Sequence, residues 1–274
     1  MQGVELSFDP IMKLTKDLRK ASETMTSDEA RFLVDYYYML QKSRVGTGNQ
    51  ILALAEEPHE VIAWINDNLA VLERNIKSAL DVYGSTHAVG AWAKSIYGIG
   101  PIIAAGLLAH IDITKTPSIS ALWSFAGLNP TAVWAKGKKR PWNARLKVLC
   151  WHAGECFKRT SGSPKSFYGK FYRERKELEV QRNEDGMFKE LAAATLEKKN
   201  IGKSTEAYKH YAAEKLPPGR LDLRATRYAT KLFLSHFWQV LYEIHYESKP
   251  PAPWIIQHGG HIDLVPIPNW PMKP

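Results

Sequence analysis

The chain has 274 residues, of which 45% are hydrophobic and 24% charged, enough to bury the core of one large domain or two small ones. No run approaches the roughly 18–20 apolar residues of a membrane span, and the start lacks a basic stretch followed by an apolar one, so we expect neither a membrane segment nor an export signal. Two cysteines, Cys150 and Cys156, are too few for a disulfide framework and indicate a reducing, cytoplasmic compartment.

The first half of the chain predicts a helix followed by a long helical hairpin. The first helix covers residues 7–24, with Ser7 or Asp9 as its cap, and the next runs from Ser27 to about residue 55. The third, at about residues 59–83, has apolar residues at alternating steps of three and four: Ile62, Ile65, Leu69, Leu72, Ile76, Ala79 and Tyr83. At 1.5 Å per residue the hairpin would be about 40 Å long. The pattern leaves open whether it is an internal bundle or a homodimerisation arm.

The remainder also predicts helices, so the expected fold class is all-α. Helices are expected at about residues 86–95, 101–110, 117–126, 142–160, 164–182 and 224–246. Residues 183–221 are interpreted as an insertion with one helical stretch and a break at Pro217-Pro218-Gly219. In the Pro-rich tail, Ile255-Ile256 and Ile262–Val265 predict a strand pair around Gly259-Gly260. The expected divisions are 1–26, 27–84, 85–182, 183–221, 222–248 and 249–274.

Positive charge is concentrated in one part of the sequence. Between Thr131 and Arg182, fourteen Lys and Arg residues face four acidic ones, an excess of ten that exceeds the +9 of the whole chain. Such a field attracts a polyanion, and nucleic acid is the commonest one in a cell. The alternative is a solvated surface that keeps the protein soluble.

The sharpest motif runs from Ser95 to Leu108 and fits a helix-hairpin-helix. Gly98 and Gly100 would permit backbone angles that other residues avoid and let a phosphate approach the main chain. Ile99 would plug the turn, and Pro101 suits a first helical turn. Ala104, Ala105 and Gly106 would keep the two helices close. The bared amides of the second helix would then bind phosphate without reading base identity. A purely structural glycine turn is the alternative.

From Ile96 to Pro130 the sequence resembles the C-terminal transposase domain of the insertion-sequence family 110/116/902, the DEDD-serine transposases or bridge-RNA-guided recombinases. The resemblance covers residues 29–182 and 221–246, with the turn, the corner Gly127-Leu128-Asn129-Pro130, the basic stretch 142–147 and the closing stretch 223–231 as its motifs, and it is most specific around the hairpin and the corner. It implies a DNA-handling helical domain preceded by a long hairpin, here residues 29–83.

Two departures from the family pattern bear on chemistry. The RuvC-like domain with its four metal-binding acids has no counterpart, because about 28 helical residues precede the hairpin where such a sheet needs roughly a hundred. The family places its nucleophilic serine just after the corner, where this sequence has Trp134 or Ala135, and neither can attack a phosphodiester. Thr131 is a weak catalytic candidate, one hydroxyl placed too early. We therefore expect that DNA handling is retained and the chemistry lost.

Other candidate chemistry has plainer explanations. Cys150 and Cys156 are six apart on a helix, so their side chains diverge by about 120° and cannot hold one zinc ion with His152. We interpret both as structural thiols. His258, His261 and Asp263 in the tail are interpreted as incidental to a Gly-rich turn. We expect no cofactor and no metal.

The sequence thus predicts a DNA-binding protein without catalysis of its own, near the nucleoid, that acts in transposition or recombination as a homodimer through residues 27–84. A branched or bent duplex is the expected target. The predicted DNA-binding residues are Tyr97, Gly98, Ile99, Gly100, Pro101, Ile102, Lys136, Lys138, Lys139, Arg140, Asn143, Arg145, Lys147, Lys170 and Arg173. Two alternatives stay open. One is an active or split recombinase that uses Thr131, Ser161 or Ser163 with a RuvC-like partner; the other is a structural protein that binds RNA or an acidic protein.

Overall fold

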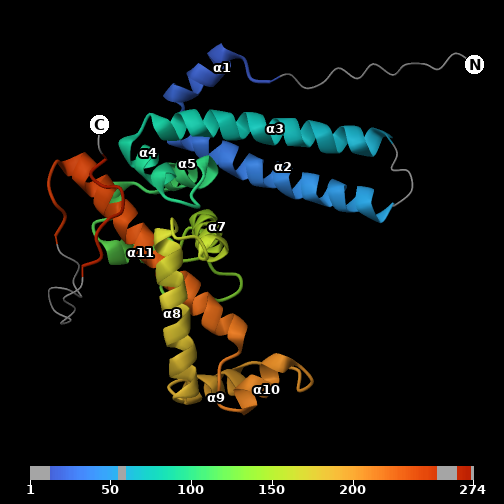
Figure 1. The fold of residues 1–274 in the computed structure, drawn as a ribbon, viewed down its shortest axis with the longest axis vertical. Coiled ribbons are helices and arrows are strands. Elements are labelled where there is room, and N and C mark those ends of the chain that lie inside the picture. Colours follow the sequence, from blue (N-terminus) through green and yellow to red (C-terminus); the bar gives the residue numbers. More distant parts are fainter. Residues whose placement is uncertain (1–12, 55–59, 252–263, 273–274) are drawn as a thin grey trace, which may run out of the picture. The chain divides into compact units, whose positions relative to one another are not determined.

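The structure of the protein, a computed structural model, describes residues 13–54, 60–251 and 264–272 (Figure 1). All regular elements among these residues are helices, which confirms the predicted all-α class for this part of the chain. None of the described helices is long and apolar enough to span a bilayer. The chain divides into two compact units, Met1–Lys94 with Gly100–Asp112, and Ser95–Ile99 with Ile113–Pro274.

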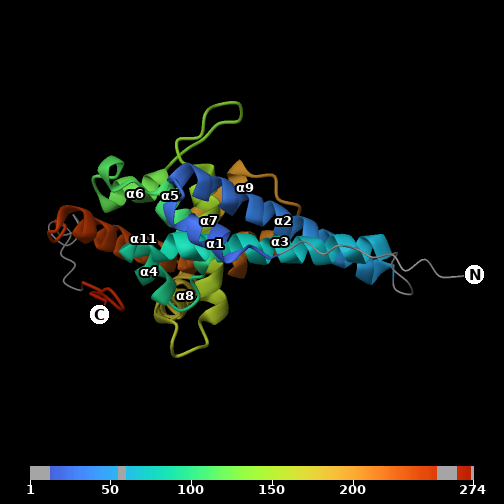
Figure 2. The ribbon, with the colours of Figure 1, turned by 90° about the horizontal axis from the view of Figure 1, so that it is seen from above.

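The first unit is built on a long antiparallel pair, α2 (Ser27–Ala53) and α3 (Glu60–Ser85), which we name the arm (Figures 1 and 2). Thr26 and Glu29 form a capping box at the start of α2, so the predicted start at Ser27 is confirmed. The short helix α1 (Lys16–Ala21) has Thr15 as its N-cap, and a 3₁₀ turn (Ser22–Thr24) follows it. The first helix therefore begins later than residue 7, and Ser7 and Asp9 lie outside the described residues.

Two further helices complete this unit, α4 (Ala88–Ser95) and α5 (Pro101–His110). α5 contacts both α2 and α3, and the Arg31 guanidinium donates to the Ala109 carbonyl oxygen (3.0 Å). Ala104 and Ala105 are fully buried. The sequence assigned these small residues to the approach of α4 and α5; their full burial, on a helix that also contacts α2 and α3, is in addition consistent with close packing against the arm.

Burial along the arm falls from its base towards its tip. At the base Ile76, Ala79 and Tyr83 are buried, as the spacing of three and four predicts. Nearer the tip Ile65, from the same apolar stripe, is 40% exposed, and Leu52 on α2 is 79% exposed. The apolar pattern of the arm is therefore longer than the surface that it buries within one chain.

The second unit is organised around α11 (Pro218–Tyr246), which contacts α6 (Ile119–Phe125), α7 (Ala144–Thr160) and α8 (Phe167–Glu184). A 3₁₀ turn (Ile113–Lys115) also lies against it. Phe157, Tyr168 and Phe233 form a buried aromatic cluster with ring centres 4.9 to 5.3 Å apart. Because each of these rings comes from a different helix and the rings bury one another, α7, α8 and α11 pack around a shared core.

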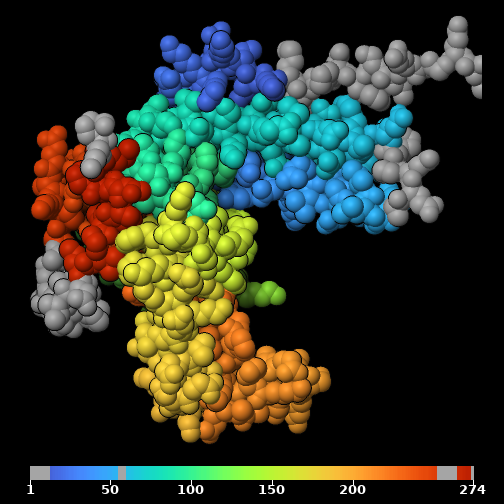
Figure 3. Space-filling view, in the orientation of Figure 1, coloured from blue at the N-terminus to red at the C-terminus, as the bar shows by residue number. Residues whose placement is uncertain are grey.

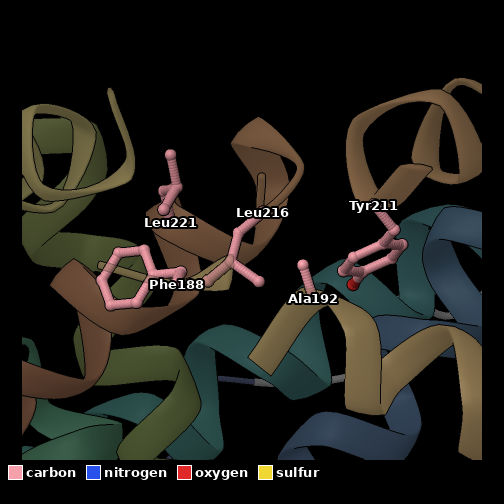
Figure 4. Packing of buried hydrophobic residues seen from close by; sticks show 5 residues of the cluster. All are labelled: Phe188, Ala192, Tyr211, Leu216 and Leu221. Carbon is pink, nitrogen blue, oxygen red and sulfur yellow. The ribbon is translucent and has the colours of Figure 1, made fainter. Parts of the chain in front are cut away.

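The stretch interpreted as an insertion is more ordered than the sequence predicted. It contains two helices, α9 (Lys189–Lys198) and α10 (Glu206–Ala212), beside the end of α8 and the start of α11 (Figures 1 and 3). They share a small core of Phe188, Ala192, Tyr211, Leu216 and Leu221 (Figure 4). Leu221 belongs to α11, so the Pro-Pro-Gly stretch begins that helix rather than breaking the chain, with Pro218 in its first turn.

The tail was expected to form a strand pair. Most of that pair, with Gly259-Gly260 and with His258, His261 and Asp263, lies outside the described residues. Leu264 and Val265, which are described, are not in a strand. The Val265 carbonyl oxygen instead lies 3.1 Å from Nε2 of the buried His236 on α11.

Candidate nucleic-acid interface

The turn between α4 and α5 is tight, and we name its residues 96–100 the elbow. The Ile99 amide donates to the Ile96 carbonyl oxygen (2.9 Å). Ile99 is 5% exposed, so its side chain is buried as predicted. Its neighbour Tyr97 is 46% exposed, and Gly98 and Gly100 are partly exposed. The elbow is therefore accessible at its backbone although its apolar plug is buried.

The two glycines of the elbow are there for different reasons. Gly98 has φ +97°, a conformation that L side chains rarely adopt, as the sequence predicted. Gly100 has φ −97° and ψ 175°, which any residue adopts, so the predicted need for an unusual angle is wrong at this position. A Cβ on Gly100 would meet nothing within 4 Å. The space beside the main chain at residue 100 is open.

The first turn of α5 follows directly. The N-cap of this helix is Gly100, so no capping side chain covers the amides of the first turn. Pro101 occupies the start of the helix as predicted. The side chain of Ile102 is buried, so only its main chain can take part in a contact with a ligand. The amides of a first helical turn carry the positive end of the helix dipole and favour an anion.

In the second unit, the corner after α6 is held by its backbone. Gly127 has φ +67°, and a Cβ there would lie 2.9 Å from both Trp142 Cγ and Lys147 Cδ. The Leu128 amide donates to the Trp123 carbonyl oxygen (2.9 Å). The chain that leaves this corner is thus fixed against the start of α7.

Thr131, the weak catalytic candidate, is exposed beside this corner. Its hydroxyl and its amide both donate to Oδ1 of Asn129, at 2.8 and 3.0 Å. An amide oxygen is too weak a base to take up the proton of an attacking hydroxyl. These two hydrogen bonds place Thr131 in a turn, and among the described residues its hydroxyl has no general base as its partner.

The chain between α6 and α7 forms a long loop (Figure 2). Four cations on it are exposed: Lys136, Lys138, Lys139 and Arg140. Trp134 orders the loop, because its indole Nε1 donates to the Lys138 carbonyl oxygen (2.6 Å) and its ring lies 5.2 Å from the Arg140 guanidinium. Within the described residues, no acidic side chain forms an ion pair with any of the four. Their charges are therefore uncompensated by close ion pairs.

The start of α7 continues this surface, and we name residues 136–147 the basic segment. Arg145 and Lys147 are exposed, and the Lys147 ammonium lies 4.3 Å from the centre of the Trp142 ring. Asn143 was predicted to contact DNA. Its Oδ1 accepts hydrogen bonds from the Arg145 and Leu146 amides (3.0 and 3.1 Å) and caps the helix. The cap fixes the direction of α7, and the DNA contact of Asn143 stays a prediction.

Lys170 and Arg173 do not belong to the same surface feature. Both are exposed on α8, and Lys170 pairs with Glu174 (3.7 Å). α8 starts beside the end of α7, since the rings of Phe157 and Tyr168 are in contact. The basic segment joins α7 at its other end, and 17 helical residues correspond to about 25 Å. These two cations therefore lie well away from the basic segment.

The thiols of α7 have the environment expected of structural residues. Burial raises the pKa of Cys150 to about 12, so this thiol stays protonated. Cys156 is partly buried, with its sulfur 3.6 Å from the Arg159 guanidinium. Over the described ranges, no three His, Cys, Asp or Glu side chains gather closely enough to hold a metal ion.

An exposed basic loop and an accessible glycine elbow on a helical scaffold are features of proteins that bind nucleic-acid backbones. Comparison with known families agrees with this class: residues 91–163 match the sequence model of the transposase IS116/IS110/IS902 family. The match contains the elbow, the corner and the basic segment, and confirms the resemblance seen in the sequence over that range. No curated protein and no solved structure matches the chain.

Proposed function

We propose that this protein binds nucleic acid, in the first place DNA, by contacting phosphates with the basic segment and with the amides of the elbow and the first turn of α5. The observation that supports this proposal most directly is the exposed loop between α6 and α7. Its four cations form no ion pair in the described part of the chain, and the loop lies inside the stretch that matches a transposase family. Phosphate contacts do not read bases, so binding is largely independent of sequence and responds to the shape of the duplex.

The elbow adds a second contribution to the proposal. Gly100 is not required by its backbone angles or by crowding, and the open space beside it would let a phosphate oxygen reach the main chain. Tyr97, which is exposed, lies next to this path. In the proposal the side chains of Ile99 and Ile102 support the elbow from within, and their backbone contributes the contact.

In this proposal the chain performs no strand transfer by itself. In the described part of the chain the Thr131 hydroxyl donates to an amide oxygen and not to a general base, and Trp134 or Ala135 stands where the family resemblance places the serine. A second candidate is a split recombinase in which Thr131, Ser161 or Ser163 acts together with a RuvC-like partner. A covalent adduct between the chain and nicked or junction DNA, with that partner or divalent metal present, would favour the second candidate.

We further infer that the protein acts as a homodimer through the arm. Support comes from apolar side chains of the α3 stripe that stay exposed towards the tip of the arm, Ile65 among them. Exposed apolar residues that continue a buried stripe are typical of a helix pair that is completed by a partner.

A binding panel tests the proposal. Single-stranded DNA, duplex DNA, a four-way junction and structured RNA are titrated with the protein at several salt concentrations. If about six phosphates are contacted, log affinity for duplex falls with log salt with a slope of about −5. Stronger binding of RNA than of any DNA would replace DNA by RNA as the partner. Affinity that does not change with salt would contradict the proposal.

The matched variants differ only in where the charge is changed. Lys138→Glu/Lys139→Glu/Arg140→Glu is expected to lose most duplex binding. The control Lys198→Glu/Lys199→Glu/Lys203→Glu makes the same change of charge at three exposed lysines near α9 and is expected to retain most of it. Circular dichroism of both variants should match the parent protein, because all six side chains are exposed.

A further inference from the structure

A row of four cations runs along one face of α11. Arg220, Arg224, Arg227 and Lys231 follow one another at steps of four, three and four. At 3.6 residues per turn these steps keep the four side chains within one narrow stripe, and at 1.5 Å per residue the stripe is about 16 Å long. We name it the cation stripe.

Residues on α8, α9 and α10 hold the first half of the stripe in place. The Arg220 guanidinium donates to the Thr195 hydroxyl (2.8 Å) and to the Tyr211 hydroxyl (3.2 Å), both of which are neutral. Arg224 forms an ion pair with Glu179. These contacts fix the direction of the two side chains but compensate little of their charge.

Glu179 is the one acidic partner that the stripe has among the described residues, and it is shared. Its fully buried carboxylate also pairs with Arg175 (2.5 Å) and lies 3.8 Å from Arg182. One negative charge therefore faces three guanidinium groups. The surroundings of Arg224 keep an excess of positive charge.

The second half of the stripe has no acidic partner within the described residues. Arg227 is exposed and forms no ion pair there, and Lys231 is half-buried with its ammonium 3.7 Å from the centre of the Trp123 ring. Desolvation, and after it repulsion from Arg224 and Arg220, lowers the pKa of Arg227. Desolvation, and after it repulsion from Arg227, lowers the pKa of Lys231. A partly buried cation without a counter-ion, as Lys231 is here, is destabilising unless an anion binds to it.

We propose that the cation stripe binds the sugar-phosphate backbone of a nucleic-acid strand, as a contact surface in addition to the basic segment. A row of cations about 16 Å long is long enough to follow successive phosphates along one strand. A small anion would need cations that converge on a point, whereas these four lie in a row. Trp123 and the exposed ring of Tyr228 border the row and offer surfaces on which sugars or bases can pack.

This inference rests on the proposed nucleic-acid binding, and the test separates the two. Duplex affinity is measured against salt for the parent protein, Arg227→Gln/Lys231→Gln and the control Lys199→Gln/Lys203→Gln, which removes the same charge from exposed lysines near α9. Loss of two phosphate contacts is expected to reduce the salt slope by about 1.8 in the stripe variant and to leave it nearly unchanged in the control. Arg227→Lys/Lys231→Arg, which keeps both charges, is expected to retain most of the slope.

A second readout does not depend on any variant. Lys231 of the parent protein is acetylated by a water-soluble reagent with and without duplex, and its modification is compared with that of Lys199 by mass spectrometry. Protection of Lys231 but not of Lys199 is expected. If the salt slope of the stripe variant is unchanged and Lys231 is not protected, the cation stripe does not bind the strand. The proposed function is then still tested by Lys138→Glu/Lys139→Glu/Arg140→Glu. Failure of the parent protein to bind any nucleic acid overturns both, and protection by an acidic polypeptide but not by duplex overturns the choice of partner.

Discussion

Replacing the two glycines of the elbow separately distinguishes a structural turn from a binding turn. At Gly98, with φ +97°, an alanine adopts a left-handed conformation that costs about 1–2 kcal/mol. Its Cβ would also lie 3.4 Å from the Thr160 hydroxyl oxygen, which is a tight contact. Gly98→Ala is therefore expected to lower the free energy of unfolding by about 1–2 kcal/mol.

Gly100→Ala is expected to behave in the opposite way. Alanine readily adopts φ −97° and ψ 175°, and its Cβ has open space within 4 Å. The entropy gained from removing a glycine is opposed by the loss of a favoured N-cap residue, so the free energy of unfolding should change by less than about 1 kcal/mol. If a phosphate oxygen approaches the main chain at this position, the added methyl group displaces it. A hydrogen bond to a charged group is worth about 1.5–3 kcal/mol, so duplex affinity should fall by about tenfold or more.

The assay combines urea unfolding, followed by circular dichroism, with duplex titration at one fixed salt concentration. The expected result is a crossed pattern in which Gly98→Ala loses stability and Gly100→Ala loses affinity. Gly219→Ala provides a control, because a Cβ there also meets nothing within 4 Å, and that glycine lies in the first turn of α11. Should Gly100→Ala bind duplex as tightly as the parent protein, the elbow is a structural turn and its proposed phosphate contact is refuted.

Three further predictions concern stability and assembly. Burial lowers the pKa of His236 to about 4. The stability that its neutral form contributes is therefore present above about pH 6.5 and lost as pH falls towards 4. An NMR titration should find this pKa, and the free energy of unfolding of His236→Gln in urea should depend less on pH than that of the parent protein. Asp222→Asn should cost about 1–3 kcal/mol in urea unfolding, because the ion pairs of this carboxylate with Lys158 and Lys176 are lost, whereas an unchanged midpoint would show that they contribute nothing. Ile65→Glu, at the exposed end of the arm, should convert the dimer into a monomer in analytical ultracentrifugation, and a monomeric parent protein would contradict the proposed assembly.

The stability of the second unit towards acid has a second source, the carboxylate of Asp222. Burial opposes ionisation of Asp222, but hydrogen bonds from Lys158, Tyr172 and Lys176 outweigh it and lower the pKa of the carboxyl to about 2. A depressed pKa stabilises the folded state above the ordinary value near 4, and this contribution is lost as pH falls towards 2. The loss of stability through His236 should therefore come at higher pH than the loss through Asp222.

Local sequence patterns predicted the elements whose determinants lie within a few residues. Pro101 marks the start of α5, and the apolar steps of three and four mark α3. The start of α11 at Pro218 was missed because a Pro-Pro-Gly stretch is equally compatible with a break and with a first helical turn. The core of α9 and α10 was missed because its members Phe188 and Leu221 are distant in sequence and each is unremarkable alone.

The candidate site shows the same division between local and distant determinants. A count of charges identified the region of positive charge, but it could not say which of its cations form ion pairs with carboxylates. Lys158 and Lys176 lie in that region, and both pair with Asp222, 64 and 46 residues away. Arg227 and Lys231 lie outside the region, yet they have no acidic partner among the described residues.

What decides whether a cation can bind a phosphate is therefore the pairing made by the fold, rather than the local density of charge. A cation that is already paired must give up one carboxylate to gain a phosphate, so the net gain is small. A cation without a partner gains the whole interaction, and a half-buried one such as Lys231 also recovers part of its desolvation cost. On this argument the exposed loop cations Lys138 and Lys139, together with Arg227 and Lys231, should dominate the salt dependence of binding, and Lys158 and Lys176 should contribute little although they lie in the most basic part of the sequence.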